Sequence, residues 1–358
     1  MKIVIVGLAL TSSWGNGHAT TYRALARALA ARGHEVLFLE RDVPWYAGNR
    51  DLPSPSYCRV RLYRDREELA ATSAADIADA DLVIVGSYVP DGINVTDFVL
   101  RTAESCTAFY DIDTPITLAA LRTNDAAYID RRQVPRFDLY LSFSGGPTLA
   151  RLETEFGAQR ARALYCSVDP DFYFEDTDGP LDYDLGYLGT YSADRQPTLE
   201  RLLIAPARAL ADGRFVIAGA QYPDDPALPR NVERIAHLPP SRHPAFYSRQ
   251  RFTLNVTRRD MIAAGYSPSV RLFEAAACGT PIISDDWPGL DQLFRPGREI
   301  LIARNTADTL AYLRDLPEIE RAAIAARARA VVLQSHTSGH RAIELEHCVA
   351  EVMGQPAR

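Results

Sequence analysis

The sequence predicts an α/β protein built from two doubly wound domains, each with a parallel sheet covered by helices. The first observation is the order at the start of the chain, where an apolar strand at 2–10, a polar loop, an amphipathic helix at 22–32 and a second strand at 34–40 follow one another. The second is that residues 183–219 repeat this order of strand, loop, helix and strand. The third is the length of 358 residues, which suits two domains of ordinary size.

Further segments complete each half. In the first half, strands are predicted at 81–86, 106–113, 137–144 and 162–166, with helices at 67–79, 94–101 and 148–156. In the second half, strands are predicted at 231–238, 251–256 and 299–303, and a short one begins with Ile282 and Ile283. Helices are predicted at 198–211, 240–249, 308–315, 318–333 and 341–352. Ligands of such sheets bind outside the carboxyl ends of the strands, so the loops at those ends are the candidates for a site.

Composition and charge exclude several classes of protein. Hydrophobic residues make up 47% of the chain, enough for real cores, and the net charge of −7 argues against a general nucleic-acid binder. The five cysteines are far apart, with no C-x-x-C pair, which predicts a reducing cytoplasm and no zinc site. The opening MKIVIVG is expected to be a strand rather than a signal peptide. The sequence contains no apolar run of about 18 residues, so no membrane-spanning helix is predicted.

The most informative stretch is 265–286, GYSPSVRLFEAAACGTPIISDD, which predicts a loop, a helix, a tight stop and a strand. Ser267 is expected to cap the helix, and Pro268 suits its first position. The N-terminus of that helix carries the positive end of the helix dipole and could bind a diphosphate. Glu274 follows about one and a half turns later, from where a carboxylate could reach the hydroxyls of a ribose. Arg271 is spaced to share its face.

The end of this stretch, FEAAACGTPIIS, resembles the donor-nucleotide motif of group-one glycosyltransferases of the GT-B fold. That resemblance implies two Rossmann-like domains facing a cleft, with the nucleotide sugar on the carboxyl-terminal side. The family's second motif glutamate maps onto Glu274, whereas the first would fall on Tyr266, so its role is not carried over. The run SPSVRLFE and the run at 12–36 are closer to the CgeB-like branch, named after a spore maturation protein.

The same resemblance implies domain limits and donor contacts. We expect an acceptor-side domain at 1–174 and a donor-side domain at 175–358, with a final helix at about 338–356 packing back on the first domain. Residues 177–181 look like the linker. The expected donor-binding residues are Gly189, Thr190, Tyr191, Arg195, His237, Arg258, Tyr266, Ser267, Pro268, Ser269, Arg271 and Glu274.

On the acceptor side, the loop after the first strand is the main candidate. Its expected contacts are Trp14, Gly15, Asn16 and Gly17, together with Trp45 in a later loop, while His18 could touch the acceptor or the donor diphosphate. His18 could equally cap the following helix, and Trp45 could belong to the core. An NAD site is an alternative, because Glu40 ends the second strand, but Thr20 stands where the third glycine of that motif belongs.

The fourth strand runs into an acidic tip formed by Asp111 and Asp113. Two carboxylates at i, i+2 on a strand point to the same side, and like charges this close raise one pKa. One of them could therefore act as a general base on an acceptor hydroxyl. The alternatives are that both cap the next helix or hold Arg122, or that they bind a metal, which the resemblance to GT-B enzymes does not favour.

The sequence therefore predicts a metal-independent, cytoplasmic glycosyltransferase that moves a hexosyl group from a nucleoside diphosphate sugar to an unknown acceptor hydroxyl. No cofactor besides the donor substrate, no nucleic-acid partner and no transmembrane segment are expected. The alternatives are a nucleotide-sugar epimerase of the same architecture, an NAD-dependent oxidoreductase, and a non-catalytic protein that binds a nucleotide sugar.

Overall fold

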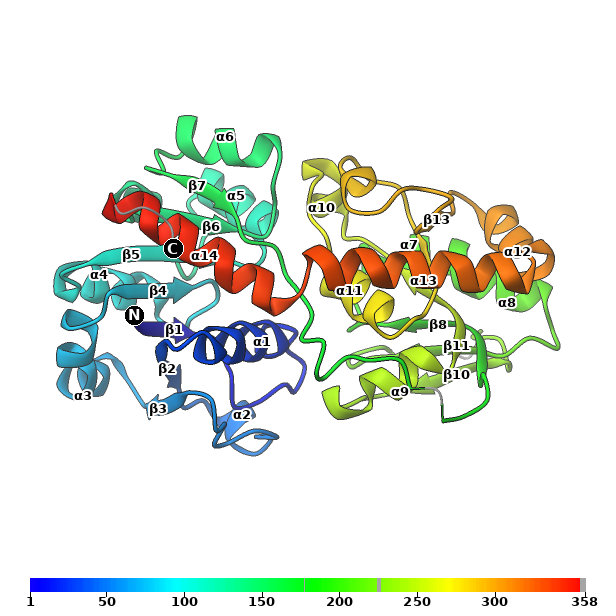
Figure 1. Ribbon diagram of the computed structural model, residues 1–358, viewed down its shortest axis with the longest axis horizontal. Coiled ribbons are helices and arrows are strands. Elements are labelled where there is room, and N and C mark those ends of the chain that lie inside the picture. Colours follow the sequence, from blue (N-terminus) through cyan, green and yellow to red (C-terminus); the bar gives the residue numbers. More distant parts are fainter. Residues whose placement is uncertain (177, 224–226, 355–358) are drawn as a thin grey trace. The chain divides into compact units, whose positions relative to one another are not determined.

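The computed structural model describes residues 1–176, 178–223 and 227–354, and the chain divides into two compact units (Figure 1). The first unit comprises Met1–Cys166 together with the chain from Ser338 onward, and the second comprises Ser167–Thr337. The division along the chain thus falls after Cys166, whereas the sequence placed it after residue 174. Residue 177 of the predicted linker and residues 355–356 of the predicted last helix lie outside the described residues.

The first unit is built on a seven-stranded parallel sheet with the order β3-β2-β1-β4-β5-β6-β7. Its strands are β1 (Lys2–Gly7), β2 (Glu35–Arg41), β3 (Arg59–Tyr63), β4 (Leu82–Gly86), β5 (Cys106–Asp111), β6 (Leu139–Ser142) and β7 (Ala161–Ala163). The central strands β4, β5 and β6 are buried along their whole length, as expected for a parallel sheet covered on both faces. The order reverses at β1, so the carboxyl ends of β1 and β4 form the switch point where ligands bind in such folds.

Helices cover this sheet, and the last helix of the chain is one of them. They are α1 (His18–Ala31), α2 (Pro44–Ala47), α3 (Arg66–Ala78), α4 (Gly92–Thr102), α5 (Thr114–Thr123), η1 (Arg131–Arg136), α6 (Pro147–Thr154) and α14 (Ser338–Met353). Helix α14, red in Figure 1, packs beside α1 and against β5 and β6. Arg341 on this helix is buried and donates from Nε to the carbonyl oxygen of Tyr165 at 3.0 Å, which fastens α14 to the end of the first unit.

The second unit repeats the plan with a six-stranded sheet of order β10-β9-β8-β11-β12-β13. Its strands are β8 (Tyr183–Leu188), β9 (Phe215–Ala218), β10 (Val232–Ile235), β11 (Gln250–Asn255), β12 (Ile282–Ser284) and β13 (Leu301–Ile302). Its helices are α7 (Gln196–Leu199), η2 (Glu200–Ile204), α8 (Ala205–Ala209), η3 (Pro240–Arg242), α9 (His243–Ser248), α10 (Arg259–Ala264), α11 (Val270–Ala277), η4 (Leu290–Gln292), α12 (Thr306–Asp315) and α13 (Glu318–Ser335). The prediction of two doubly wound parallel sheets is confirmed.

Several local predictions need correction. Helix α11 begins at Val270 with Ser269 at the N-cap position, so the prediction of a cap at Ser267 with Pro268 as the first helical residue was wrong. The helix predicted at 198–211 is interrupted by the π-helical turn η2, after which α8 starts again around Pro206, which lacks an amide N–H to donate. Strand β3 and helices α5 and α10 were not predicted. Among the described helices, none has both the length and the apolar character needed to cross a bilayer.

Candidate functional site

In the second unit, Asn255 at the carboxyl end of β11 organises the start of helix α11. Its Oδ1 accepts hydrogen bonds from Ser269 Oγ at 2.8 Å and from Arg271 Nη1 at 2.9 Å. Ser269 therefore uses its hydroxyl on Asn255 and makes no side-chain cap to its own helix. A helix start without a side-chain cap keeps its first amides available, which suits an anion.

Arg271 brings a positive charge to the same place. Its side chain is buried, and its Nε donates to the Leu188 carbonyl oxygen at 2.6 Å while its guanidinium lies 4.7 Å from the centroid of the Tyr187 ring. A Cβ added to Gly189 would lie 2.6 Å from Tyr187 Oη and 2.8 Å from Arg271 Nη2. A larger residue at 189 would therefore have to displace the guanidinium and the phenol that approach each other at the end of β8.

Two carboxylates hold the loops that flank these groups. Asp285 accepts from Thr257 N at 2.8 Å and from Thr257 Oγ1 at 2.7 Å, and Asp194 accepts from the amide of Arg259 at 3.1 Å. Burial opposes ionisation of Asp194, but its hydrogen bonds with Ser192 and the Arg259 amide hold the pKa of this carboxyl below its usual range. Arg258 is thus bracketed on both sides by residues whose backbone is fixed.

Arg195, a predicted donor contact, lies in the loop between β8 and α7. Its Nη2 donates to the Thr190 carbonyl oxygen at 2.6 Å, and its Nε is buried without a hydrogen-bond partner in the described part of the chain. The loop itself is anchored by Tyr191, whose amide donates to the Ala220 carbonyl oxygen at 2.9 Å. The predicted loop is therefore ordered by its backbone and keeps hydrogen-bonding capacity on its arginine.

A cavity of about 520 Å³ opens beside this loop. Its wall includes apolar side chains of α7, η2 and β9, and it also includes Tyr191, Tyr222 and Arg234. Several buried polar atoms in and around it have no hydrogen-bond partner among the described residues. They are Tyr187 Oη, Arg195 Nε, Tyr222 Oη and Arg234 Nη1. Buried polar groups in folded proteins are normally satisfied, so such a cluster indicates a place for a polar ligand or for ordered water.

Three predicted donor contacts have particular surroundings. Glu274 is buried at 3% exposure, and its Oε2 accepts from Tyr247 Oη at 3.2 Å. His237 is exposed, and the cavity is lined by its neighbour Ala236 instead. Tyr266 has a positive φ of 50°, and its ring fills the space over Gly289, where a Cβ would lie 2.4 Å from it. Tyr266 therefore serves as a packing element of the loop that leads to α11.

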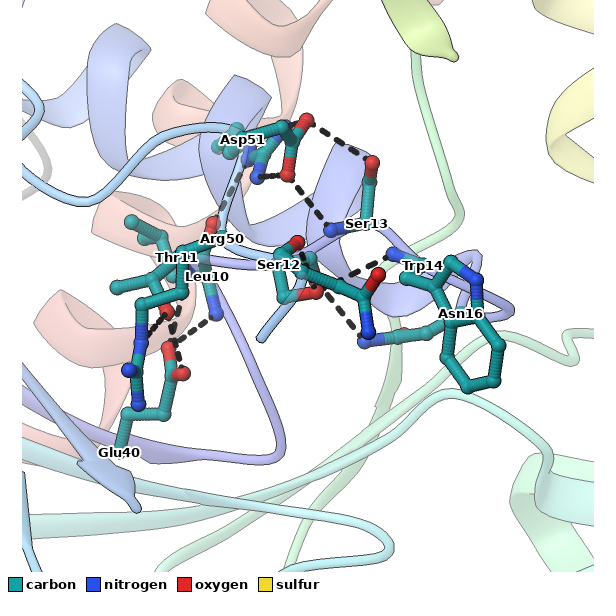
Figure 2. A network of polar contacts seen from close by, with 11 residues as sticks. Leu10, Thr11, Ser12, Ser13, Trp14, Asn16, Glu40, Arg50 and Asp51 are labelled. Atoms are coloured by element: carbon teal, nitrogen blue, oxygen red, sulfur yellow. Dashed lines mark hydrogen bonds and ion pairs between the residues drawn. The ribbon is translucent and has the colours of Figure 1, made fainter. Parts of the chain in front are cut away.

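In the first unit, Glu40 at the end of β2 holds the loop after β1. Its carboxylate accepts from Leu10 N at 2.7 Å, Thr11 N at 2.9 Å and Thr11 Oγ1 at 2.6 Å, and the residue is fully buried (Figure 2). The NAD alternative required this carboxylate to bind a ribose, but its hydrogen bonds are already made within the loop. The structure therefore gives Glu40 a structural role.

Asp51 holds the next part of the same loop. It accepts from the backbone amide and the hydroxyl of Ser13, both at 2.9 Å (Figure 2). It also forms a bidentate pair with Arg23 at 2.8 Å. Partial burial acts to raise the pKa of Asp51, but the hydrogen bonds from Arg23 and Ser13 lower it to about 2. The Trp14 amide donates to Ser12 Oγ at 3.3 Å, while Trp14 itself is 43% exposed (Figure 2).

The other predicted acceptor-side residues occupy ordinary loop or helix-start positions. Gly15 has φ +63°, a conformation that glycine adopts without strain. Asn16 Oδ1 accepts from the amide of His18 at 2.8 Å, and Gly17 is the N-cap residue of α1, so His18 is the first helical residue and does not cap the helix. Trp45 lies in α2 and is 54% exposed, which excludes a core position within this unit.

The two carboxyl groups at the end of β5, those of Asp111 and Asp113, have different surroundings. Asp111 is fully buried and accepts from Tyr140 Oη at 2.6 Å and Thr117 Oγ1 at 2.7 Å. Burial raises the pKa of Asp111 to about 7, against these hydrogen bonds, and the charge of Asp113 adds to the rise. The predicted upward shift is thus present, with burial rather than like-charge repulsion as its main cause.

Asp113, in contrast, is half-buried and occupies the N-cap position of α5 without a side-chain cap bond. Its Oδ2 accepts from Tyr88 Oη at 3.1 Å, and the Tyr88 ring meets the His18 ring edge-on with centroids 5.2 Å apart. Burial lowers the pKa of His18, while the charge of Asp113 opposes that change. The three predicted catalytic residues therefore lie in one unit, with Asp113 and His18 on either side of Tyr88. Arg122 pairs with Glu155 and is not held by these aspartates.

Sequence reasoning missed Asn255, Asp285, Tyr187, Tyr222 and Arg234. For Asn255 and Asp285 the signal was available, because both are polar residues at the carboxyl ends of predicted strands. Among the described residues, the structure places no group of three or more His, Cys, Asp or Glu side chains that could hold a metal ion.

Comparisons with known proteins agree with this architecture. Residues 195–347 match the family described as glycosyl transferase-like. Sucrose-phosphate synthase from Thermosynechococcus elongatus is similar in structure at 14% identity and a TM-score of 0.71, with 99% of each chain covered. HepE from Anabaena in complex with UDP-glucose has the same identity, TM-score and coverage. An alpha-glucosyltransferase in complex with UDP-glucose and DNA containing an abasic site reaches a TM-score of 0.73 at 14% identity, over 98% of this chain and 99% of the other. No curated protein matches the sequence.

At these identities the structural likeness establishes the fold. The chain has the GT-B architecture of two Rossmann-like domains, and this prediction is confirmed. The family match covers the part of the chain that contains α11 and the arginines around it.

Proposed function

We propose that this protein is a glycosyltransferase that moves a sugar from a UDP-sugar to an acceptor hydroxyl. The observation that carries the proposal is the convergence of Arg271, Arg195 and the start of α11 at one edge of the second sheet, inside the segment that matches the glycosyl transferase-like family. The solved structures of HepE and the alpha-glucosyltransferase hold UDP-glucose and share this architecture, which favours UDP as the nucleotide. Within this class, the SPSVRLFE run supports the CgeB-like branch.

The leaving group of such a reaction is a nucleoside diphosphate, and its charge must be stabilised as the glycosidic bond breaks. Arg271 is held in place by Leu188 and Asn255, so its guanidinium is preorganised before a ligand arrives. The helix start at Ser269 adds amide donors and the positive end of the helix dipole. Because these cations and dipoles already supply the required charge, we expect turnover to continue in EDTA.

The nucleoside would then occupy the neighbouring cavity of about 520 Å³. Glu274 is proposed to hold the ribose, as the sequence predicted; its Oε2 also accepts a hydrogen bond from Tyr247 Oη at 3.2 Å. Six of the remaining predicted donor contacts lie in two loops, Gly189, Thr190 and Tyr191 after β8, and Arg258, Ser267 and Pro268 between β11 and α11.

On the acceptor side, Asp113 is the better candidate for the general base. Asp111 has no exposed surface and its carboxyl is bound to Tyr140 and Thr117, so it cannot touch an acceptor without rearrangement. Asp113 is partly accessible, and His18 lies next to its partner Tyr88. We therefore assign proton removal to Asp113 and a positioning role to Asp111. Trp14 and Trp45 offer exposed rings on which a sugar could stack.

The net charge of the protein bears on which acceptors it can bind. A net charge of −7 disfavours a polyanionic acceptor, although the alpha-glucosyltransferase above was solved with DNA. A cytoplasmic site of action fits the five widely spaced cysteines and the cytoplasmic supply of nucleotide sugars.

The proposal is tested by incubating the chain with UDP-glucose and UDP-galactose, with and without a panel of hydroxyl acceptors, and following release of UDP. A transferase releases UDP slowly by hydrolysis alone and faster with a competent acceptor. Formation of an epimerised nucleotide sugar, or of a free sugar intermediate with UDP, supports the epimerase alternative. If no UDP-sugar binds or turns over, and NAD alone raises the melting temperature, the proposal is wrong.

A further inference from the structure

The cavity beside β9 and β10 has one wall that limits which ligand groups can contact it. Tyr187 and Arg234 are both paired in register with Ile217, so the three side chains form a row on one face of strands β8, β9 and β10. Arg234 and Ile217 line the cavity directly. The row thus places the Arg234 guanidinium at one end of a cavity wall that is otherwise largely apolar.

Arg234 is held in a fixed orientation by stacking. Its guanidinium carbon lies 3.8 Å from the centroid of the Tyr222 ring, a favourable cation–π distance. Burial lowers the pKa of Arg234 from its ordinary value, yet an arginine keeps its proton at neutral pH. The side chain therefore enters the cavity wall as a planar, oriented group that carries only hydrogen-bond donors.

One of these donors has no hydrogen-bond partner among the described residues. Arg234 Nη1 is buried and makes no hydrogen bond to the residues that the structure describes, and the same holds for Tyr222 Oη beside it. Because Arg234 Nη1 can only donate, a ligand atom that pairs with it must accept a hydrogen bond. A ligand N–H at this place would face another N–H, and neither group would have an acceptor. The cavity therefore distinguishes a carbonyl from an amino group at the point where a ligand meets Arg234.

We propose that Arg234, stacked on Tyr222, makes the donor site selective for nucleotides whose base has a carbonyl at the position that meets Arg234 (C4 of a pyrimidine or C6 of a purine) over those with an amino group at that same position. This inference rests on the proposed function, because it takes the occupant of the cavity to be the base of the nucleotide donor. The placement follows from continuity: Tyr187, in the same row, lies under the guanidinium of Arg271 at the proposed diphosphate site. The apolar remainder of the wall, Leu199, Ile204, Ile217 and Leu228, suits the flat faces of a base.

The selectivity is tested without any variant by calorimetric titration of the wild-type chain with paired nucleotides. UDP and CDP have rings of the same size and differ at C4, where uracil has a carbonyl and cytosine an amino group. GDP and ADP make the same contrast at C6 of a larger ring, so one pair is informative whichever ring size the cavity admits. We expect the carbonyl member to bind about tenfold tighter or more, because the other leaves a buried donor unpaired.

The assignment to Arg234 is tested with Arg234→Leu and Arg234→Gln. The leucine variant removes the donor and should reduce the UDP-to-CDP preference to less than about threefold. The glutamine amide can both donate and accept, so this variant should bind CDP better than the wild type does. Arg208→Leu is the matched control, because Arg208 is an exposed arginine on α8 that pairs with Glu200, and it should keep the wild-type preference.

Each outcome decides a separate point. If UDP and CDP, and also GDP and ADP, bind the wild type equally well, the selectivity is wrong while the proposed function stands. If the preference exists but survives in folded Arg234→Leu, another residue reads the base and the assignment to Arg234 is overturned. If none of these nucleotides binds the wild-type chain, the proposed function itself fails.

Discussion

The first crossover loops of the two sheets, after β1 and after β8, occupy equivalent positions but differ in how their polar groups are satisfied. In the first unit, Glu40 and Asp51 bind the loop through its backbone amides and hydroxyls. In the second unit, Arg195 Nε and the nearby phenol of Tyr187 are buried without hydrogen-bond partners among the described residues. The backbone of the first loop is thus satisfied from within the unit, and its open polar atom is His18 Nδ1 at the end of the loop, which is buried without a partner among the described residues. In the second loop the open atoms lie on the arginine of the loop itself and on the phenol beside it, as expected where a ligand binds.

The largest expected effect concerns Asp111, the buried carboxyl of the first unit. Its pKa is raised from 3.8 to about 7, so its contribution to stability is fully present below pH 4 and is lost as the pH rises through 7. About 1.4 kcal/mol per pKa unit gives a loss of about 4 kcal/mol in the unfolding free energy of this unit over that range. Urea unfolding at pH 4.5 to 8 checks this against Asp111→Asn, which should lack this part of the pH dependence. Equal pH profiles for the two proteins would contradict the assignment.

The next effect concerns the completed loop itself. Glu40→Ala removes the acceptor of two backbone amides and one hydroxyl, all buried, and should lower the free energy of unfolding by about 3 kcal/mol. Glu40→Gln keeps one acceptor oxygen and should cost less. Because this loop belongs to the first unit, UDP affinity measured by calorimetry should stay within about twofold of wild type. A large loss of UDP binding in folded Glu40→Gln would break the comparison between the two loops.

In the second unit, Arg271→Ala removes the hydrogen bonds to Leu188 and Asn255 and should therefore lower stability, and in addition it should weaken ligand binding. Charge-assisted hydrogen bonds are worth about 1.5–3 kcal/mol, so UDP affinity should fall about 100-fold. Arg329→Ala is the control, because Arg329 donates from Nε to the Ala277 carbonyl oxygen at the opposite end of α11, at 3.1 Å. It should reduce the melting temperature but leave the dissociation constant for UDP unchanged. Equal losses of UDP affinity in the two variants would show that Arg271 only supports the helix.

The smallest effect gives the sharpest contrast, since it compares two buried phenols. Tyr140→Phe in the first unit removes a hydrogen bond to Asp111 at 2.6 Å and should destabilise the protein by about 1.5 kcal/mol without changing UDP affinity. Tyr187→Phe in the second unit removes a hydroxyl that has no partner in the described chain, so the ligand-free protein should be equally stable or slightly more stable. UDP affinity should then fall about fivefold. Destabilisation of the ligand-free protein by Tyr187→Phe would contradict an unsatisfied hydroxyl.

The sequence predicted the fold because the evidence for it is local. Apolar runs such as 81–86 and the FEAAACGTPIIS stretch carry strand, helix and stop signals within a few residues. Strand β3 escaped prediction because it lies at the sheet edge with alternating arginines, Arg59 and Arg61, and little burial. The true start of α11 could not be read either, because Ser269 is held by Asn255, a residue 14 positions away in the chain.

The candidate site was predicted only in part, for the same reason. Arg195 and Arg271 could be proposed from motif position, but the row formed by Tyr187, Ile217 and Arg234 depends on the register between three strands. Likewise, Asp111 and Asp113 are equivalent in the sequence, and only the packing of Tyr140 and Thr117 around the first makes them different.

The central claim is that the carboxyl edge of the second sheet binds a UDP-sugar with its base in the cavity. It is tested most directly by photolabelling the chain with 5-azido-UDP-glucose and mapping the labelled peptides by mass spectrometry. We expect a label on one or more of the cavity residues, which lie between Tyr191 and Ala236 in the sequence, and we expect excess UDP to prevent it. A UDP-sensitive label confined to the loop at 8–17, or a label that UDP does not displace, would contradict it.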